Sequence, residues 1–135
     1  MALREDWFEL EKLHRAAREG NLSQISSLVA EGFEIDAFDD LSRTPLHYAV
    51  EEGQLGAAQL LISLGSNVNR HDEEMIGETP LCLAVQGDSP EIVGLLMAHG
   101  AIADIPGWMG LTARVRAKKR SDENGKIIAA MLEAG

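Results

Sequence analysis

Residues 43–65 read RTPLHYAVEEGQLGAAQLLISLG, and a similar stretch, ETPLCLAVQGDSPEIVGLLMAHG, occupies residues 78–100. When Leu46 is aligned with Leu81, 35 residues later, small and apolar residues coincide along both stretches. The coincident pairs are Ala49 with Ala84, Val50 with Val85, Leu60-Leu61 with Leu95-Leu96, and Gly65 with Gly100. A near-constant period of this length indicates a repeat protein, in which one structural unit is encoded more than once.

Each copy carries the pattern of two short helices, and the first helix begins at a Thr-Pro pair. Thr44 supplies an N-cap hydroxyl, and Pro45 has a φ angle that suits the first helical turn. Leu46, Ala49 and Val50 then recur at helical spacing. This pattern predicts a narrow face of small side chains that lets a neighbouring helix come close.

The second helix of the unit is predicted over residues 56–64. Gly53 is expected to end the first helix and Gly65 the second, in a backbone conformation that is costly for other residues. In the next copy Ser89 and Pro90 give the second helix a start of the Thr-Pro type. The inner side of residues 56–64 is expected to carry Ala57, Leu60, Leu61 and Leu64.

Two degenerate copies flank this pair. Leu13, 33 residues before Leu46, lies in KLHRAAREGNLSQISSLVAEG, and Thr112, 33 residues after Thr79, begins TARVRAKKRSDENGKIIAAMLEAG. Terminal units of an array diverge because one of their faces meets water instead of a neighbour. We therefore expect one domain over residues 1–135, with repeats at roughly 10–38, 39–73, 74–106 and 107–135, and an N-terminal lid at 1–9 that contains Trp7 and Phe8.

The chain resembles the ankyrin-repeat family through TPLHYA at 44–49, TPLCLA at 79–84, GSNVN at 65–69 and GAIAD at 100–104. The resemblance covers about residues 10–135 in four units. It implies an all-α solenoid of stacked helix-turn-helix units, with finger turns that protrude from the stack and a curved, concave side.

Two departures from the pattern are expected to change local structure. The two extra residues between Leu46 and Leu81 fall in RHDEEMIGE, which predicts one longer and more acidic finger. In the last unit Arg114 stands where Leu46 and Leu81 stand, and KKRSDENG also carries a two-residue surplus that lengthens the link between the last helices.

Composition limits the compartment and the class of partner. Hydrophobic residues make up 45 % of the chain but aromatic residues only 4 %, which favours a core of aliphatic side chains between helices. Cys82 is the only cysteine, so no intramolecular disulfide is possible, and neither a signal-like segment nor a run of eighteen apolar residues occurs. We expect a cytoplasmic protein with no membrane segment. The net charge of −10 makes nucleic acid an unfavourable partner and a basic protein a favourable one.

Residue types that often carry chemistry have structural explanations here. His14 and His47 share one repeat position, to which the family resemblance assigns a structural hydrogen bond. His99 precedes a helix-ending glycine, where a cation meets the helix dipole. The run from His71 to Glu74 offers metal ligands, but a contiguous exposed run is more often a surface charge cluster, so no metal is predicted. Cys82 has no base nearby in sequence, and no phosphate-binding or nucleophile motif occurs, so we predict no enzyme activity and no cofactor.

The resemblance implies that finger tips and the exposed side of the first helices form the recognition face. Trp108, on a glycine-flanked finger, is expected to anchor the partner; the alternative is that its ring folds back as a lid over the last repeat. The partner-binding positions implied by the resemblance are Asp40, Leu41, Arg43, Glu51, Glu52, Met75, Ile76, Glu78, Gln86, Asp88, Trp108, Met109 and Leu111.

Charge is segregated along the chain. Residues 1–110 hold 19 acids and 6 bases, a charge of −13, whereas residues 111–135 hold 3 acids and 6 bases, a charge of +3. The bases of the second segment include a run that either contacts an acidic element of a partner or forms the solvated face of a capping helix. This run, here called the basic stripe, consists of Arg114, Arg116, Lys118, Lys119 and Arg120.

Together these features predict a non-catalytic protein-binding module that is a monomer when free. Its preferred form is an acidic inhibitor or immunity-type protein that neutralises a basic partner such as a toxin enzyme, because electrostatic steering accelerates such association. The alternative is a signalling or assembly adaptor that binds one protein through its acidic face and a second through the basic stripe.

Overall fold

The computed structural model describes residues 8–75 and 77–134, and within these ranges the chain is helical and contains no strand. The predicted N-terminal lid lies mostly outside the described residues, since only Phe8 and Glu9 of it are described. Helices follow one another in pairs: α2 (Lys12–Glu19) with α3 (Leu22–Ala30), α4 (Pro45–Glu51) with α5 (Leu55–Ser63), α6 (Pro80–Ala84) with α7 (Pro90–Ala98), and α8 (Ala113–Lys119) with α9 (Glu123–Ala134).

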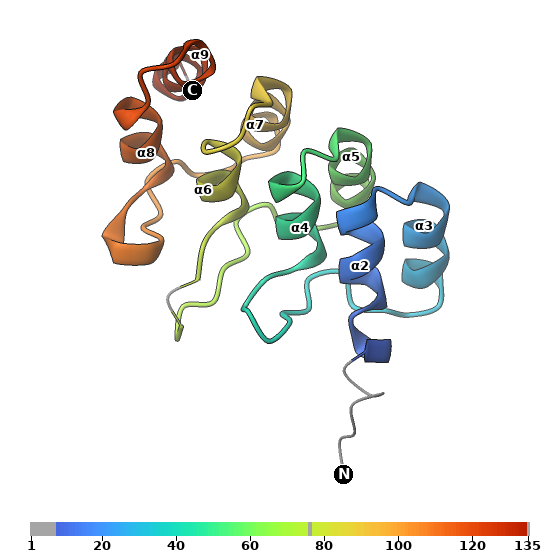
Figure 1. Cartoon of the computed structure of the whole chain (residues 1–135). Helices are drawn as coiled ribbons and strands as arrows, with labels where there is room; N and C mark the ends of the chain where they lie inside the picture. Colours follow the sequence, from blue (N-terminus) through green and yellow to red (C-terminus); the bar gives the residue numbers. More distant parts are fainter. Residues whose placement is uncertain (1–7, 76, 135) are drawn as a thin grey trace.

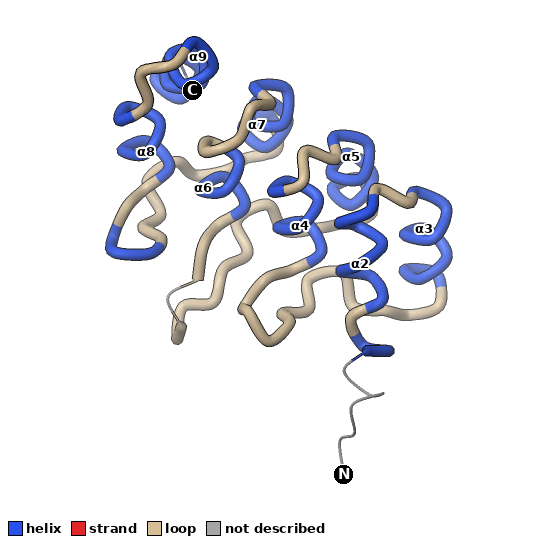
Figure 2. Tube along the Cα trace, viewed as in Figure 1, coloured by secondary structure: helices blue, strands red, loops and turns tan. Residues whose placement is uncertain are grey.

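The pairs stack side by side in two layers (Figure 1). Helices α2, α4, α6 and α8 form one layer, and α3, α5, α7 and α9 form the other. Figure 2 shows that the long loops between successive pairs all protrude from the same edge of the stack. The predicted all-α solenoid of helix pairs with protruding fingers is confirmed, whereas the exact bounds of the repeats remain a prediction.

Side-chain hydroxyls start the helices as predicted. The Thr79 hydroxyl accepts a hydrogen bond from the Cys82 amide at 3.1 Å, and the Thr112 hydroxyl accepts one from the Val115 amide at 3.1 Å. Ser89 caps α7 in the same way, at 3.3 Å from the Ile92 amide. These caps satisfy amide groups that a helix of five to nine residues would otherwise leave without partners.

The second helix of the central unit begins and ends one residue earlier than predicted. Helix α5 spans Leu55–Ser63, and Gly65, with φ of +112°, turns the chain after it. Leu64 is therefore a cap residue and is 40 % exposed. Ala58, which was not predicted on the inner side, is fully buried. The prediction of Leu64 on the inner side was wrong because the shift of the helix end removes it from the buried stripe.

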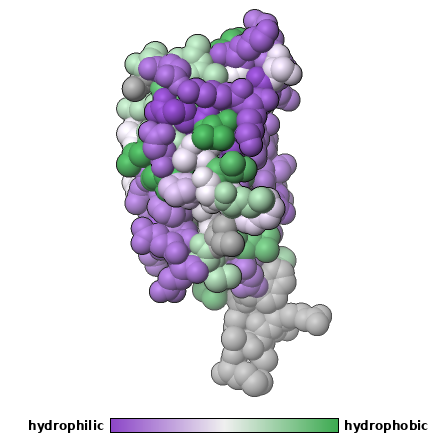
Figure 3. Space-filling view, turned by 90° about the vertical axis from the view of Figure 1, so that its left-hand side faces the viewer, coloured by the Kyte–Doolittle hydropathy of each residue, from purple (hydrophilic) through white to green (hydrophobic). Residues whose placement is uncertain are grey.

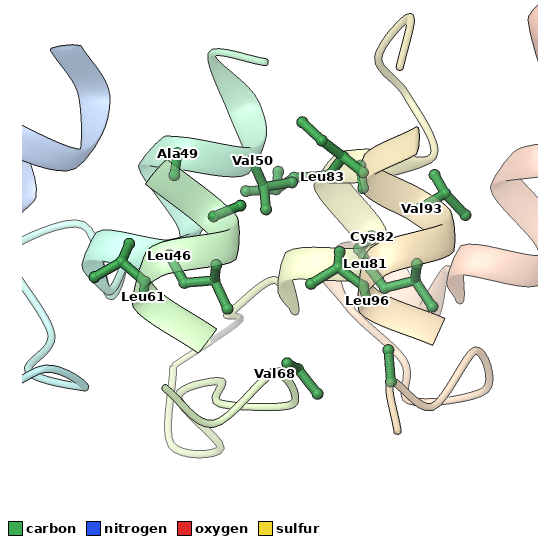
Figure 4. Close-up of a cluster of buried hydrophobic side chains, with 14 of the residues drawn as sticks. Leu46, Ala49, Val50, Leu61, Val68, Leu81, Cys82, Leu83, Val93 and Leu96 are labelled. Carbon is green, nitrogen blue, oxygen red and sulfur yellow. The ribbon is translucent and has the colours of Figure 1, made fainter. Parts of the chain in front are cut away.

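The core is made of aliphatic side chains that lie between neighbouring pairs (Figure 4). Leu46 and Leu81 from the first helices are fully buried, as are Leu61 and Leu96 from the second. Each such side chain contributes about 1.5–3 kcal/mol through burial. The stack is therefore held together mainly by contacts between one pair and the next.

A buried histidine joins successive units through the backbone. His47 has no exposed surface, and its Nε2 donates to the Glu78 carbonyl at 2.6 Å while its Nδ1 accepts from the Thr44 amide at 3.1 Å. His14 makes the equivalent bond to the Arg43 carbonyl at 3.1 Å and a further one to the Ala37 carbonyl at 2.8 Å. The predicted structural role of this position is confirmed at both histidines.

The last pair keeps the stack but changes its polar contacts. Arg114, in the position of the buried leucines, places Nε 2.9 Å from Asp104 and Nη1 3.2 Å from the Leu132 carbonyl. Val115 and Ile127 remain 40 % and 42 % exposed. Figure 3 looks onto this end of the stack, where hydrophilic surface predominates and apolar patches are small. Within the described ranges, no helix has the length and apolar content needed to cross a membrane.

We predict that acid destabilises the protein through His47. Burial lowers its pKa from 6.5 to about 4, and the hydrogen bond to the Glu78 carbonyl opposes this shift only in part. Because the unfolded chain binds the proton more tightly, the stabilisation is complete above pH 6.5 and is lost as the pH falls towards 4, by on the order of 3 kcal/mol. Urea unfolding at several pH values measures this loss.

The matched control is His47→Gln, whose side-chain amide still has a donor for the Glu78 carbonyl but does not titrate. Its free energy of unfolding should vary less between pH 6.5 and 4 than that of the original protein. Equal pH dependence in the two proteins would contradict the assignment to His47.

Candidate functional site

Three fingers precede the first helices of successive units and carry exposed apolar tips. They are finger A (residues 37–43), finger B (residues 71–78) and finger C (residues 104–111), which includes the short 3-10 helix η1 (Trp108–Gly110). Leu41 is 70 % exposed, Met75 64 %, Trp108 55 % and Met109 71 %. We call these four residues the finger ridge. Large exposed apolar side chains on neighbouring loops are typical of surfaces that a partner covers.

Finger A is shaped by one carboxylate at its base. Asp39 accepts hydrogen bonds from the amides of Leu41 at 2.9 Å and Arg43 at 3.1 Å, and from the Tyr48 hydroxyl. Burial and the hydrogen bond to Asp39 raise the pKa of Tyr48 to about 12, so the phenol remains a donor. These bonds fix the turn that exposes Leu41.

Finger B is held by a second carboxylate and is tied to finger A. Asp72 accepts from the amides of Glu74 at 3.1 Å and Met75 at 3.2 Å, and from the Ser42 hydroxyl at 2.9 Å. The hydrogen bond from Ser42 is the main cause that lowers the pKa of Asp72. Neighbouring finger tips are therefore linked directly.

Finger C is attached to the stack through Glu78. This carboxylate accepts the Trp108 amide at 2.7 Å and forms a two-point ion pair with Arg116, at 2.5 and 2.8 Å. Burial would raise the pKa of Glu78, but the bonds from Arg116 and Trp108 outweigh it and lower the pKa overall. Gly107 and Gly110 flank the tip, and Met109 has φ of +59°. The ion pair thus determines where Trp108 lies.

The predicted residues of the first helices lie about one helix length from the fingers. Glu51 and Glu52 are at the end of α4, and Gln86 and Asp88 follow α6. A seven-residue helix such as α4 separates its ends by about 10 Å. Glu51 forms an ion pair at 2.5 Å with Arg43, which precedes the start of α4. Glu52 and Gln86 are exposed.

The structure brings some of the sequence-predicted residues together and gives others internal roles. Asp40, Leu41, Met75, Trp108 and Met109 are exposed on adjacent fingers. Trp108 is not folded back as a lid, because its side chain is more than half exposed. Ile76 lies outside the described residues. Internal contacts involve Arg43, Glu51, Glu78 and Asp88, and Leu111 is half-buried.

The basic stripe is neither a free solvated face nor an open docking site, because its arginines bind groups of this chain. Arg116 is paired with Glu78, and Arg114 with Asp104. Arg120 donates to the carbonyls of Val85 at 2.9 Å and Gly87 at 2.6 Å and also contacts Asp88 and Asp122. Lys118 contacts Glu133 at 3.2 Å, and Lys119 is exposed. The arginines therefore attach the last pair to its neighbour.

Residues considered for chemistry lie in structural positions. Cys82 is fully buried, with Sγ 3.9 Å from the carbonyls of Ile105 and Leu111. His71 donates its Nδ1–H to the Asn69 carbonyl at 2.8 Å, and its Nε2 lies 3.8 Å from Glu73. In the described part of the chain, no three His, Cys, Asp or Glu side chains are arranged to hold a metal ion.

Sequence reasoning missed the residues that position the fingers. Asp39 carries a recognisable signal, since an aspartate two and four residues before bonded amides forms an Asx-type turn. The pairing of Glu78 with Arg116 spans 38 residues and has no local signal. Glu78 and Arg116 come together only because α8 stacks on α6.

Comparisons with known proteins agree with this geometry. The family model described as ankyrin repeats (many copies) matches residues 13–62, and the ankyrin repeat model matches residues 76–107. The chain is 32 % identical over 126 residues to the human transient receptor potential cation channel subfamily A member 1, covering 91 % of the chain and 11 % of the channel.

Two further relatives show the same kind of partial match. An ankyrin repeat-containing protein of Treponema pallidum (strain Nichols) is 33 % identical over 111 residues, which are 82 % of the chain and 37 % of that protein. Inversin of Danio rerio is 31 % identical over 90 residues, which are 67 % of the chain and 9 % of inversin. The chain therefore spans only a minor part of the length of these curated relatives.

We predict that Glu78→Gln loosens finger C and destabilises the protein by about 3 kcal/mol, because Arg116 is left buried without its counter-charge. Hydrogen exchange of the amides in residues 105–111 and urea unfolding measure the two effects. Asp104→Asn is the matched control, since it removes an exposed ion pair with Arg114 and should destabilise the protein much less. Equal effects of both variants would contradict the positioning role of Glu78.

Proposed function

The chain belongs to the ankyrin-repeat family, whose repeats are protein–protein interaction modules, and we propose that it captures a basic protein partner on its fingers without catalysing a reaction. The observation that carries the proposal is the finger ridge. Leu41, Met75, Trp108 and Met109 are each more than half exposed, on neighbouring loops that hydrogen bonds hold in place. A partner would bury these side chains with little loss of loop entropy.

Acidic side chains on the fingers and at the far end of α4 support a basic partner. Asp40 on finger A, Glu73 and Glu74 on finger B, and Glu52 at the end of α4 are all exposed. Residues 1–110 carry a net charge of −13, so the field around the fingers attracts cations. Steering of this kind raises association rates, while the apolar tips slow dissociation.

The preferred specific role is an inhibitor or immunity-type protein that is monomeric when free and covers the active groove of a basic enzyme. The net charge and the row of fingers held by internal hydrogen bonds support this version. The adaptor alternative required the basic stripe as a second docking site. Because Arg114, Arg116 and Arg120 are engaged within the chain, no observation favours that alternative.

We expect Asp40→Asn combined with Glu52→Gln to weaken partner binding by about tenfold at low salt and less at high salt, because exposed charges act over a screened range. The measurement is affinity capture from the native lysate, with retained proteins identified and then titrated with the purified chain. The matched control, Glu91→Gln with Glu123→Gln, removes the same charge from the layer of second helices.

A basic enzyme that is retained by the original protein, is inhibited by it, and is lost selectively with the finger variant would support the inhibitor role. Equal retention by the finger variant and the control variant would contradict the acidic binding face. Two different proteins bound at the same time would replace the inhibitor with an adaptor.

A further inference from the structure

A cavity of about 580 Å³ lies beside finger A, between the start of α2 and the loop that follows α3. Its apolar lining is formed by Leu10, Phe33, Ala37 and Phe38. This volume is within the range of ligand pockets, about 300–1,000 Å³, and exceeds what one ordered water needs. The cavity contains part of finger A but none of the finger ridge.

The polar lining of this cavity is strongly acidic. Among the described residues, five carboxylate residues line it, namely Glu11, Glu31, Glu34, Asp39 and Asp40, and no lysine or arginine does. Asp39 is engaged by the finger A amides, but the other four form no ion pair within the described ranges. Close unpaired carboxylates repel one another and favour a bound cation.

A buried histidine also belongs to the wall of the cavity. His14 lines the cavity, is 4 % exposed, and directs Nε2 to the carbonyls of Ala37 at 2.8 Å and Arg43 at 3.1 Å. Two carbonyl acceptors require the proton on Nε2, which leaves Nδ1 as an acceptor. This Nδ1 is buried and has no hydrogen-bond partner in the structure.

The equivalent nitrogen in the next unit explains why the Nδ1 of His14 is unpaired. Nδ1 of His47 is satisfied by the amide and hydroxyl of Thr44, three residues earlier. Three residues before His14 stands Glu11, which lines the cavity and provides no side-chain cap. The unpaired nitrogen therefore lies at the end of α2 that borders the cavity, but it has almost no solvent-accessible surface, so the polar groups open to the cavity are its carboxylates.

Among the described residues, the side chains that make the cavity polar are mainly carboxylates, which are acceptors, and its floor is apolar and aromatic. A guanidinium group matches both features, since it offers five N–H donors and stacks on aromatic rings. The chain itself provides an example at Phe38, where the Arg70 guanidinium lies 4.3 Å from the ring centroid. Phe38 and Arg70 both line a second cavity, which shares Phe38 with the first.

We propose that this cavity binds an arginine side chain, with a flanking apolar side chain, from an extended segment of the partner protein. The proposal rests on the protein-binding function and names the chemistry of one segment of that partner. Continuity supports it, because Asp40 belongs both to the cavity and to the acidic border of the finger ridge. A segment that crosses finger A can therefore place its arginine in the cavity.

The test titrates the full chain, labelled with ¹⁵N, with acetyl-Leu-Arg-Leu-amide at low salt. The matched probe is acetyl-Leu-citrulline-Leu-amide, which keeps the shape of arginine and removes its charge. We expect saturable shifts of the Phe33, Ala37 and Phe38 amides and of the His14 Nδ1 resonance, and binding at least about tenfold weaker for the citrulline peptide. Equal affinity of the two peptides would overturn the proposal. Free arginine amide is a third probe; if it bound as tightly as the tripeptide, the cavity would be a small-molecule site and the proposal would also be overturned.

Variants separate the cavity from the general acidity of the chain. Glu31→Gln with Glu34→Gln removes two exposed cavity carboxylates and should weaken the arginine peptide by about tenfold. Glu73→Gln with Glu74→Gln removes the same charge from finger B and should leave affinity within about twofold. Equal losses would show attraction by net charge alone and would overturn the site. Shifts confined to Leu41, Met75 and Trp108 would also overturn it while leaving the proposed finger surface intact.

Discussion

The structure depends on one constraint: no helix pair is able to bury its own apolar face. The helices of the central units have five to nine residues, and isolated helices shorter than about 12–15 residues are marginal in water. Leu46, Leu61, Leu81 and Leu96 are removed from water only because the pairs stack. Stability is therefore a property of the interfaces between units, as expected for a quasi-one-dimensional array.

Stacking also requires polar connections from one unit to the next, because short helices and long loops leave many backbone groups to be satisfied. His47 reaches the carbonyl of Glu78, and Asn69 binds both the Gly100 carbonyl at 3.0 Å and the Ile102 amide at 2.9 Å. These bonds recur at the spacing of the repeat. They hold the layers in register and leave the fingers as the part of each unit that is free to vary.

The acidic residues consequently divide into two groups with different structural roles. Asp39, Asp72 and Glu78 accept amide, hydroxyl or guanidinium hydrogen bonds and determine the shape of the fingers. Asp40, Glu31 and Glu34 have no ion pair within the described chain and act through their charge on whatever approaches. Net charge alone does not distinguish the two groups. The acids available to a partner are therefore fewer than the composition suggests, because those of the first group are already hydrogen-bonded within the chain.

The sequence by itself determined the repeat, the Thr-Pro helix starts and the glycine ends, because each helix signal depends on residues within a few positions of one another. The structural role of the histidines came from the family resemblance, since His47 bonds a carbonyl 31 residues away. Tertiary structure alone decided the rest. It placed Glu78 against Arg116 across 38 residues, engaged the arginines of the basic stripe, and left Nδ1 of His14 without a hydrogen bond beside an acidic cavity. These features arise where separate units meet, and a contact across a stacking interface has no signature in local sequence.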